Sequence, residues 1–225
     1  MNVLEPIWMR TLIKDTYSSL KNRGIHKGLK RIKRALIDRE GTQYCLKMDV
    51  RKFYPSIDHD ILKQIIRRKI KDKSVLWLLD EIIDSAAGIP IGNYLSQYFG
   101  NIYLSGLDHW LKEQRECKYY FRYCDDIVIL HNDKKHLSNL RKEISRYLKT
   151  ELNLDLKANW QVFPTNKRGI DFLGYRFFHD FTLVRKSIVK NFKKKMKKTT
   201  SVETLASYHG WFLWADTYNL KEKYL

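Results

Sequence analysis

The sequence has few cysteines, no long apolar run and no repetitive stretch. Its three cysteines, Cys45, Cys117 and Cys124, form no CxxC pair and have no neighbouring histidine at metal-ligand spacing. This argues against a disulfide framework or a cysteine-based zinc site and indicates reduced thiols. No apolar segment is long enough to cross a bilayer, and no stretch resembles a signal peptide. We therefore expect a cytoplasmic protein with no membrane partner.

Acidic residues are scarce relative to basic ones. The chain of 225 residues has 43 Lys and Arg against 25 Asp and Glu, which is a formal net charge of +18. Hydrophobic residues make up 44% of it, which argues against disorder, and the length allows one large or two small domains. A folded chain with this charge predicts a polyanionic partner, with nucleic acid as the first candidate and a membrane surface as the second.

Hydrophobic periodicity predicts both strands and helices, which places the chain in the α+β class. We expect helices over 6–20, 26–40, 56–70, 74–88, 94–114, 133–152 and 201–220. We expect strands over 44–50, 118–124, 127–132 and 154–163, followed by a small hairpin over 169–186. This order is typical of the split β-α-β-β-α-β fold, an antiparallel sheet with helices on one face and the other face free.

The segment YYFRYCDDIVIL, residues 119–130, places Asp125 and Asp126 between two apolar strands. Aspartate tolerates the positive φ angles of hairpin turns, so we expect the Asp pair itself to form the turn. In this topology the turn lies beside Asp49 at the end of the first strand. Three close carboxylates repel one another unless cations neutralise them, and two Mg²⁺ ions suit such oxygen ligands. The simpler alternative is a hairpin turn and an unrelated surface Asp49.

Five segments resemble, in order, the motifs of reverse transcriptases. YCDD at 123–126 resembles the YxDD box, and KMDVRKFYPSIDH at 47–59 resembles the first catalytic motif. GIPIGNYLSQYFGNIYL at 88–104 resembles the motif that lines the nucleotide pocket. LDLKANWQVF and GIDFLGYRFF resemble the two later palm motifs, the second being the primer grip. The resemblance covers about residues 1–185 and implies a reverse-transcriptase palm that carries out RNA-templated DNA synthesis.

The resemblance also implies which residues act on the metal ions. Asp49, Asp125 and Asp126 correspond to the catalytic carboxylates, with the Val50 carbonyl as a further metal ligand and Asp126 as the outer one. Two Mg²⁺ ions, which Mn²⁺ can replace, would activate the attacking hydroxyl and stabilise the leaving pyrophosphate.

Other positions are implied to contact the substrate. Tyr54 would lie under the incoming sugar and exclude a 2′-hydroxyl, and Lys157 would hold the triphosphate or protonate the pyrophosphate. Without the resemblance, an ordinary core aromatic residue is the better explanation of Tyr54, and a solvated surface charge that of Lys157. The implied nucleotide-site residues are Tyr54, Ile91, Gly92, Gln97 and Lys157, and the implied primer grip is Leu173, Gly174 and Tyr175.

The motif around Gly92 departs from most of the family. Ile91 stands where Gln usually precedes the glycine, and Ser96-Gln97 replaces the usual Ser-Pro. This form resembles the reverse transcriptases of diversity-generating retroelements, whereas group II intron and retron enzymes generally keep Gln-Gly and Ser-Pro. The resemblance implies an error-prone enzyme of bacterial or phage origin. Its implied partners are a template RNA, a DNA or RNA primer, dNTPs and a small basic accessory protein.

The resemblance divides the chain into three parts. Residues 1–41 are expected to be a helical remnant of the fingers, 42–185 the palm, and 186–225 a short, basic, thumb-like segment. The run 186–198 has seven lysines in thirteen residues and predicts salt-sensitive contacts with a nucleic-acid backbone. Because the fingers segment is short for the family, we expect N-terminal truncation and impaired polymerase activity.

Two readings outside this family remain open from the sequence. A non-catalytic RNA-binding module on a ferredoxin-like sheet explains the charge, because such sheets stack exposed aromatic residues on bases. It leaves the converging carboxylates unexplained. A nucleotide cyclase on a similar palm is disfavoured by the lysine-rich tail and by the loop at 88–93.

The first prediction concerns base selection. An apolar side chain at Ile91 cannot make the hydrogen bond that the usual Gln makes near the nascent pair, so discrimination between bases falls. We expect Ile91→Gln to lower misincorporation, measured by sequencing the products of primer extension on a defined RNA template. An unchanged error spectrum contradicts this role for Ile91.

Overall fold

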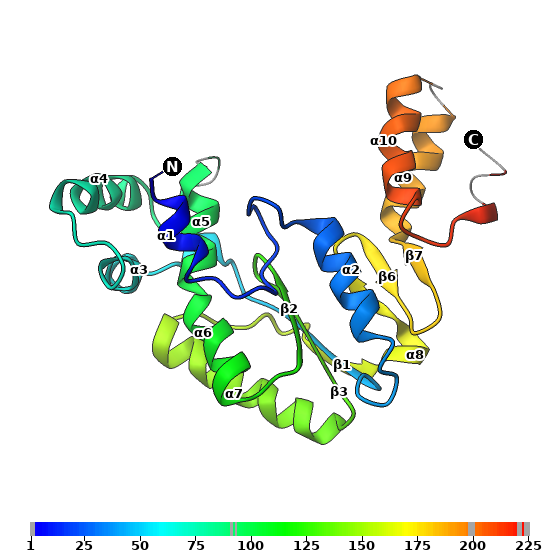
Figure 1. Ribbon diagram of the computed structural model, residues 1–225, viewed down its shortest axis with the longest axis horizontal. Coiled ribbons are helices and arrows are strands. Elements are labelled where there is room, and N and C mark those ends of the chain that lie inside the picture. Colours follow the sequence, from blue (N-terminus) through cyan, green and yellow to red (C-terminus); the bar gives the residue numbers. More distant parts are fainter. Residues whose placement is uncertain (1–2, 91, 93, 198–200, 220–221, 223–225) are drawn as a thin grey trace.

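A four-stranded antiparallel sheet forms the centre of the computed structural model, which describes residues 3–90, 92, 94–197, 201–219 and 222 (Figure 1). Its strands follow the order β2-β3-β1-β4. They comprise β1 (Tyr44–Asp49), β2 (Tyr119–Tyr123), β3 (Asp126–His131) and β4 (Gln161–Pro164). The helices between β1 and β2 and the long helix between β3 and β4 complete the predicted β-α-β-β-α-β pattern.

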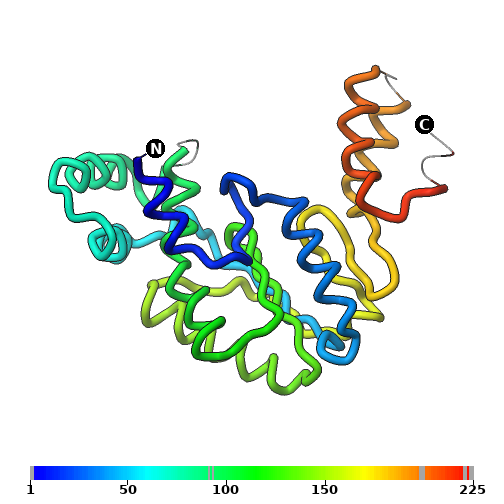
Figure 2. Tube along the Cα trace, viewed as in Figure 1, coloured from blue at the N-terminus to red at the C-terminus, as the bar shows by residue number. Residues whose placement is uncertain are grey.

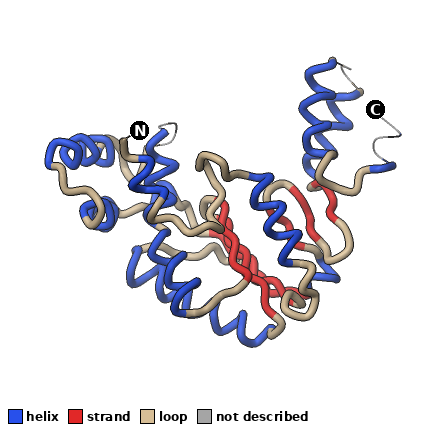
Figure 3. The backbone as a smooth tube through the Cα atoms, in the orientation of Figure 1, coloured by secondary structure: helices blue, strands red, loops and turns tan. Residues whose placement is uncertain are grey.

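A layer of helices covers one face of this sheet (Figure 3). Strand side chains that alternate along β1 and β3, such as Leu46, Met48 and Ile129, are buried in this layer. The helices on this side are α1 (Glu5–Met9), α3 (His59–Arg67), α4 (Lys73–Asp84), α5 (Tyr94–Tyr103), α6 (Ser105–His109) and α7 (Lys134–Leu152). Asp58 and Asp72 cap α3 and α4 by accepting hydrogen bonds from Ile61 N and Val75 N.

The opposite face of the sheet is also covered, so the expectation of a free face is wrong. Cys45, Phe121 and Val128 on this face are at most 2% exposed. Helix α2 (Ile25–Ala35) and a second, three-stranded sheet pack against them. The second sheet consists of β5 (Ile170–Phe172), β6 (Tyr175–Phe177) and β7 (Thr182–Val184). Phe121, the aromatic residue in the middle of β2, is therefore unavailable for stacking on bases.

The basic C-terminal segment forms a pair of helices. Helices α9 (Lys186–Met196) and α10 (Val202–Phe212) pack through Phe192, Tyr208 and Phe212, whose rings contact one another. The pair projects from the second sheet, at the opposite end of the molecule from α4 (Figure 2). Short helix α8 (Thr165–Arg168) follows β4. Among the described residues, no helix combines the length and the apolarity needed to span a membrane.

Several predicted elements are shorter than their periodicity indicated, including the helix expected over 201–220, which ends at Phe212. The helix expected over 6–20 ends at Met9, because the following chain pairs with β2 instead: Tyr17 N donates to Arg122 O at 3.1 Å. The helix expected over 94–114 breaks between α5 and α6, where Ser105 Oγ donates to Ile102 O, and ends in a π-helical turn. Of the strand expected over 154–163, only its end is β4, although Leu156 forms an isolated bridge with Val50.

A fully buried ion pair joins these segments. Arg122 on β2 and Asp108 on α6 are both 0% exposed, and Arg122 Nη2 lies 2.5 Å from Asp108 Oδ2. Asp108 also accepts hydrogen bonds from the hydroxyls of Thr16 and Tyr120. The side chain of Asn101 on α5 accepts from Arg122 and donates to Ser18 O. The N-terminal segment, two helices and the edge strand are therefore held by one network.

The second prediction concerns this pair. Removing one partner of a buried ion pair leaves an uncompensated charge, so Asp108→Ala should lower the free energy of unfolding by about 3–5 kcal/mol. The double variant Asp108→Leu, Arg122→Met should lose much less than the sum of the single variants. Denaturant unfolding measures both, with Lys149→Ala as a control because its pair with Asp155 is 60% and 57% exposed. A loss for Asp108→Ala no larger than the control's contradicts the prediction.

Candidate functional site

The sheet register brings the predicted carboxylates together. Asp49, the last residue of β1, lies directly opposite Asp126, the first residue of β3. Residues opposed in this way have Cβ atoms about 4.5–5.5 Å apart. Asp125 precedes Asp126 in the turn and is close enough to interact with the Asp49 carboxylate. In the view of Figure 1, this hairpin tip lies between α5 on one side and α9 with α10 on the other.

The turn itself differs from the prediction. Tyr123 pairs with Asp126, so the two turn residues are Cys124 and Asp125 rather than the two aspartates. Cys124, with φ 56°, takes the left-handed conformation that was expected of an aspartate. As a result Asp126 belongs to a strand, and its side chain lies on the same face as that of Asp49.

The buried side chain of Arg122 supports this turn from the core of the protein. The sequence analysis did not identify this role. Arg122 Nη1 donates to the Cys124 carbonyl at 2.8 Å, while the other nitrogens of the side chain bind Asp108. The buried ion pair of the fold therefore also supports the backbone that presents Asp125. The sequence does contain a sign of this role. Arg122 is the charged residue of the strand YYFRY, at a position where the alternation of side chains along the strand points it into the core.

Each of two carboxylates has a lysine beside it. Lys157 Nζ lies 3.3 Å from Asp49 Oδ1, and Lys47 Nζ lies 3.1 Å from Asp126 Oδ2. The backbone N–H of Lys157 also donates to the Asp49 carbonyl at 2.9 Å. The structure thus brings Lys157 to the candidate site. The sequence analysis did not identify Lys47, although strand period places it on the same face as Asp49, two residues away.

Burial and mutual repulsion weaken the acidity of the carboxyl groups. Burial raises the pKa of Asp126 to about 6, and Asp49 and Asp125 add to the increase while Lys47 opposes it. The pKa of Asp125 is also raised, first by burial and then by the charge of Asp49. Such a site disfavours accumulated negative charge unless cations are present.

The donor set fits divalent cations, although it does not form a closed metal cage. Asp126 Oδ1 is buried and has no hydrogen-bond partner in the described part of the chain. In the neighbouring backbone, Asp49 O accepts a hydrogen bond from Lys157 N, and Arg51 N donates one to Asp155 O. Val50 lies between these two bonds, so its carbonyl points the other way, toward β3. Within the described ranges, no group of three or more His, Cys, Asp or Glu side chains has metal-binding geometry. An open site of this kind suits Mg²⁺, which keeps waters and substrate oxygens as ligands.

Tyr54 lies beside the turn. It begins a short 3₁₀ helix, Tyr54–Ser56, and its hydroxyl oxygen lies 3.2 Å from Cys124 Sγ, which donates to it. Burial raises the pKa of Tyr54, so the phenol stays protonated. Gly100 on α5 packs against its ring: a Cβ there would lie 3.2 Å from the ring. The aromatic ring is therefore fixed next to the carboxylates.

The loop before α5 is only partly described. Gly92 has φ 100° and nothing within 4 Å of the position of a Cβ, so it is open to a close approach. Gln97 is exposed on α5. Ile91 lies outside the described residues.

The predicted primer-grip residues form a tight hairpin turn. Leu173 and Gly174 connect β5 and β6 and have φ angles of 53° and 84°. Leu173 is buried against α2, where a Cβ on Gly28 would clash with it, and Tyr175 is buried with its hydroxyl donating to Trp211 O at 3.2 Å. The side chains of Leu173 and Tyr175 therefore fix the hairpin, and only the turn backbone is available to a ligand.

Polar contacts tie this hairpin to the carboxylates. Lys47 Nζ, which binds Asp126, also donates to the Asp171 carbonyl on β5. The Asp171 carboxylate accepts from Arg185 at 2.6 Å, and Arg185 N donates to the Gly174 carbonyl at 2.9 Å. Arg185 is the N-cap of α9, so the basic helix pair, the hairpin and Asp126 are connected.

Comparison with known sequences gives one consistent result. The family model described as reverse transcriptase (RNA-dependent DNA polymerase) matches residues 1–177. Protein YkfC of Escherichia coli is 24% identical over 218 residues, covering 77% of this chain and 57% of that protein. The group II intron-encoded protein LtrA of Lactococcus lactis is 26% identical over 177 residues, covering 72% and 29%. A putative COX1/OXI3 intron 2 protein of Saccharomyces cerevisiae is 25% identical over 206 residues, covering 59% and 24%. The chain thus spans between a quarter and three fifths of these relatives.

Solved structures show the same fold. Telomerase from Candida tropicalis in complex with a fragment of telomeric RNA superposes with a TM-score of 0.64 at 15% identity, covering 89% of this chain and 41% of that one. The corresponding Candida albicans complex gives a TM-score of 0.62 at 14% identity, covering 86% and 42%. At this identity the likeness concerns the fold.

The third prediction follows from the raised pKa of Asp126. In the folded state the Asp126 carboxyl keeps its proton up to about pH 6, whereas its ordinary pKa is 3.8. The free energy of unfolding therefore falls as the pH rises from 3.8 to about 6. Asp126→Asn removes the effect. Its stability relative to the unmutated chain should therefore increase between pH 4 and pH 7, by no more than about 3 kcal/mol. Urea unfolding in the presence of a chelator measures the difference, and a constant difference across this range contradicts the raised pKa.

Proposed function

Because the chain belongs to the reverse transcriptase family, we propose that it is the catalytic palm of an RNA-directed DNA polymerase. The observation that carries this proposal is the register of β1 and β3, which opposes Asp49 to Asp126 with Asp125 in the adjoining turn. Three carboxylates, from β1, β3 and the turn before β3, with raised pKa values at two of them, suit a site that is neutralised by divalent cations. When bound, two such ions supply activation of a primer 3′-hydroxyl and stabilisation of the leaving pyrophosphate.

The chain's own residues would then divide the remaining work. Asp49 and Asp125 hold the cations together with the Val50 carbonyl, and Asp126 acts as an outer ligand kept in place by Lys47. Lys157, which is paired with Asp49, would bind the triphosphate if a cation took its place at that carboxylate. Tyr54, fixed beside Cys124, closes the sugar site against a 2′-hydroxyl.

The basic helix pair supplies a surface for the template–primer duplex. Helix α9 follows directly on Arg185, its N-cap, which contacts the predicted primer grip, and it carries exposed lysines along its length. Contacts of this kind are independent of sequence and weaken steeply with salt. The Candida telomerases of the same fold are complexes with RNA, which favours an RNA template here.

Within the family, we infer the diversity-generating type. This rests on the sequence IGNYLSQ alone, with Ile91 before Gly92 and Gln97 after Ser96. It implies an error-prone enzyme and a small basic accessory protein. The similarity to group II intron proteins makes that type the alternative within the family. Since the chain spans only part of its relatives, the activity of a whole protein is itself part of this proposal.

A non-catalytic RNA-binding module on the same sheet is less favoured. Such a module needs exposed aromatic residues on the open face of its sheet. Here α2 and the second sheet cover part of that face, Phe121 is 2% exposed, and the part left open carries Asp49 and Asp126.

The fourth prediction tests the catalytic proposal. Asp125→Asn keeps the shape of the side chain and removes its charge, so template-dependent primer extension with Mg²⁺ should fall by at least about a hundredfold. A labelled primer on an RNA template, with dNTPs, measures it. Asp155→Asn is the matched control, because that carboxylate is exposed and paired only with Lys149. Equal extension by Asp125→Asn and the unmutated chain would falsify the proposal, as would RNA binding without any Mg²⁺-dependent extension.

A further inference from the structure

The side chain of Lys47 joins the carboxylates to the β5–β6 hairpin, which is expected to hold the primer. It leaves β1 on the same face as Asp49, and its Nζ lies 3.1 Å from Asp126 Oδ2. The same Nζ donates to the backbone carbonyl of Asp171 on β5. The Lys47 side chain is only 24% exposed, so most of it is enclosed between the two sheets. One ammonium group therefore contacts both a candidate metal ligand and the strand that leads into the turn at Gly174.

Elements away from the carboxylates hold the turn of this hairpin. Leu173 packs on α2, where a Cβ on Gly28 would clash with it, and a Cβ on Gly174 would clash with the Trp211 ring of α10. Within the described ranges, β1 and β3 make no hydrogen bond to the hairpin other than that of Lys47. Packing thus holds the hairpin against α2 and α10, and Lys47 ties it to the strands that carry Asp49 and Asp126.

A lysine suits this double contact. An ammonium group has three N–H donors, so one can serve the Asp126 carboxylate and another the Asp171 carbonyl. The bond to the carboxylate is charge-assisted, which makes it stronger than a bond between neutral groups. Lys47 Nζ also lies over the Phe172 ring, 6.0 Å from its centroid. The position of β5 relative to Asp126 is therefore set by one side chain of defined length.

We propose that Lys47 is a positioning residue, which places the primer-grip hairpin over the carboxylates and so aligns the primer 3′-terminus with the metal site. This inference rests on the proposed polymerase function. Reacting atoms have to approach within about 3–3.5 Å, and a misplacement of about 1 Å can cost about a hundredfold in rate. The simpler alternative is that Lys47 only neutralises the charge of Asp126.

The fifth prediction concerns Lys47→Met, which keeps the unbranched apolar stem and removes both hydrogen bonds. Extension of a correctly paired primer at saturating dNTP should fall by about tenfold or more, because its terminus is no longer aligned. Extension of a primer with a mismatched 3′ base should fall much less, because that terminus is already displaced. Single-turnover assays with labelled primers on an RNA template measure both. The ratio of matched to mismatched extension should fall by about threefold or more.

Lys47→Arg is the conservative variant. It keeps the positive charge and the donors, so it should restore most of the ratio. A loss of ratio in Lys47→Met that Lys47→Arg reverses distinguishes positioning from a general loss of folded protein, which lowers matched and mismatched extension by the same factor.

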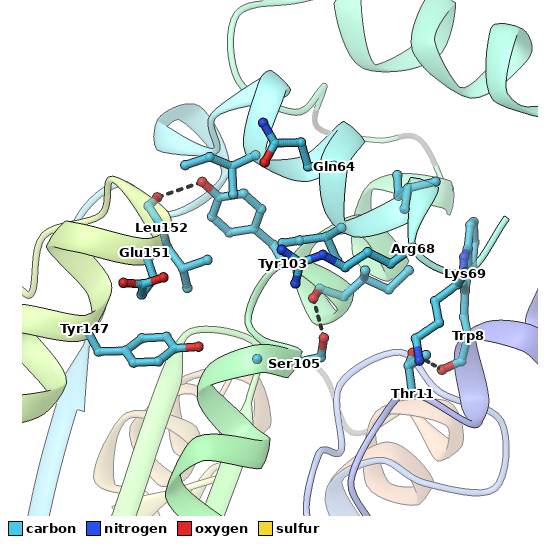
Figure 4. A pocket seen from close by; sticks show the side chains of 15 residues that line it. Trp8, Thr11, Gln64, Arg68, Lys69, Tyr103, Ser105, Tyr147, Glu151 and Leu152 are labelled. Atoms are coloured by element: carbon cyan, nitrogen blue, oxygen red, sulfur yellow. Dashed lines mark hydrogen bonds between the residues drawn. The ribbon is translucent and has the colours of Figure 1, made fainter. Parts of the chain in front are cut away.

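Two further variants control for lost stability. In the π-helical turn Trp110–Gln114, Lys112 is 23% exposed, and its Nζ lies 3.2 Å from Asp15 Oδ2 and from the Cys117 carbonyl. Lys112→Met therefore loses the same kinds of contact as Lys47→Met. On the helical side of the central sheet, Tyr103 donates to Leu152 O at 2.6 Å (Figure 4), and Tyr103→Phe removes this buried bond. Both should change the ratio by less than about twofold.

Hydrogen exchange tests the same contact without catalysis. In Lys47→Met the backbone amides of the segment 170–177 should exchange about tenfold faster, since the hairpin has lost its tie to the central sheet. Lys47→Arg and Lys112→Met should exchange there as the unmutated chain does. If the unmutated chain extends no primer, the proposed polymerase function fails, while the exchange rates still decide whether Lys47 fixes the hairpin.

The proposal is overturned if Lys47→Met lowers matched and mismatched extension equally, or leaves both unchanged. Unchanged exchange over 170–177 has the same consequence. A third contradicting result is a variant that reaches half-maximal extension at lower Mg²⁺ with its ratio and exchange unchanged, because Lys47 then only competes for Asp126.

Discussion

The buried ion pair between Asp108 and Arg122 connects the fold to its candidate active site. Both side chains are fully buried, and each has further partners that satisfy its remaining hydrogen-bonding groups. The same guanidinium binds the carbonyl of Cys124, so the turn that presents Asp125 is supported from the core. A pair with this much burial is stable only when complete, because either partner alone would be an uncompensated charge. The position of the turn therefore depends on α6, α5 and the N-terminal segment.

A second set of contacts links the carboxylates to the part of the molecule expected to hold the primer. Lys47 bridges Asp126 and the backbone of β5, and Arg185 bridges Asp171 and the hairpin backbone at Gly174. Because Arg185 is the N-cap of α9, these contacts connect the basic helix pair to the hairpin and, through Lys47, to Asp126. Lys47, which is paired with Asp126, therefore also connects the central sheet to the second sheet.

Much of the architecture followed from local patterns. Strand alternation around Asp49, the apolar runs flanking the Asp pair and the helix after β3 predicted the central sheet and its order of elements correctly. The wrong predictions lie where a locally favoured conformation competed with contacts to a distant part of the chain. Residues 10–20 have helical spacing, but their backbone groups pair with β2 instead. Cys124 occupies the left-handed turn position because the strand pairing extends to Asp126, which no feature of the Asp pair itself could reveal.

By itself, the sequence determined the family, the carboxylates, the positive charge and the order of strands and helices, since these depend on residue identity and on period. Tertiary structure alone decided which charges are paired and which faces are buried. It placed lysines beside Asp49 and Asp126, covered much of the second face of the sheet and turned Tyr175 into the core. These features depend on packing between segments far apart in the chain, where spacing along the sequence carries no information about distance in space.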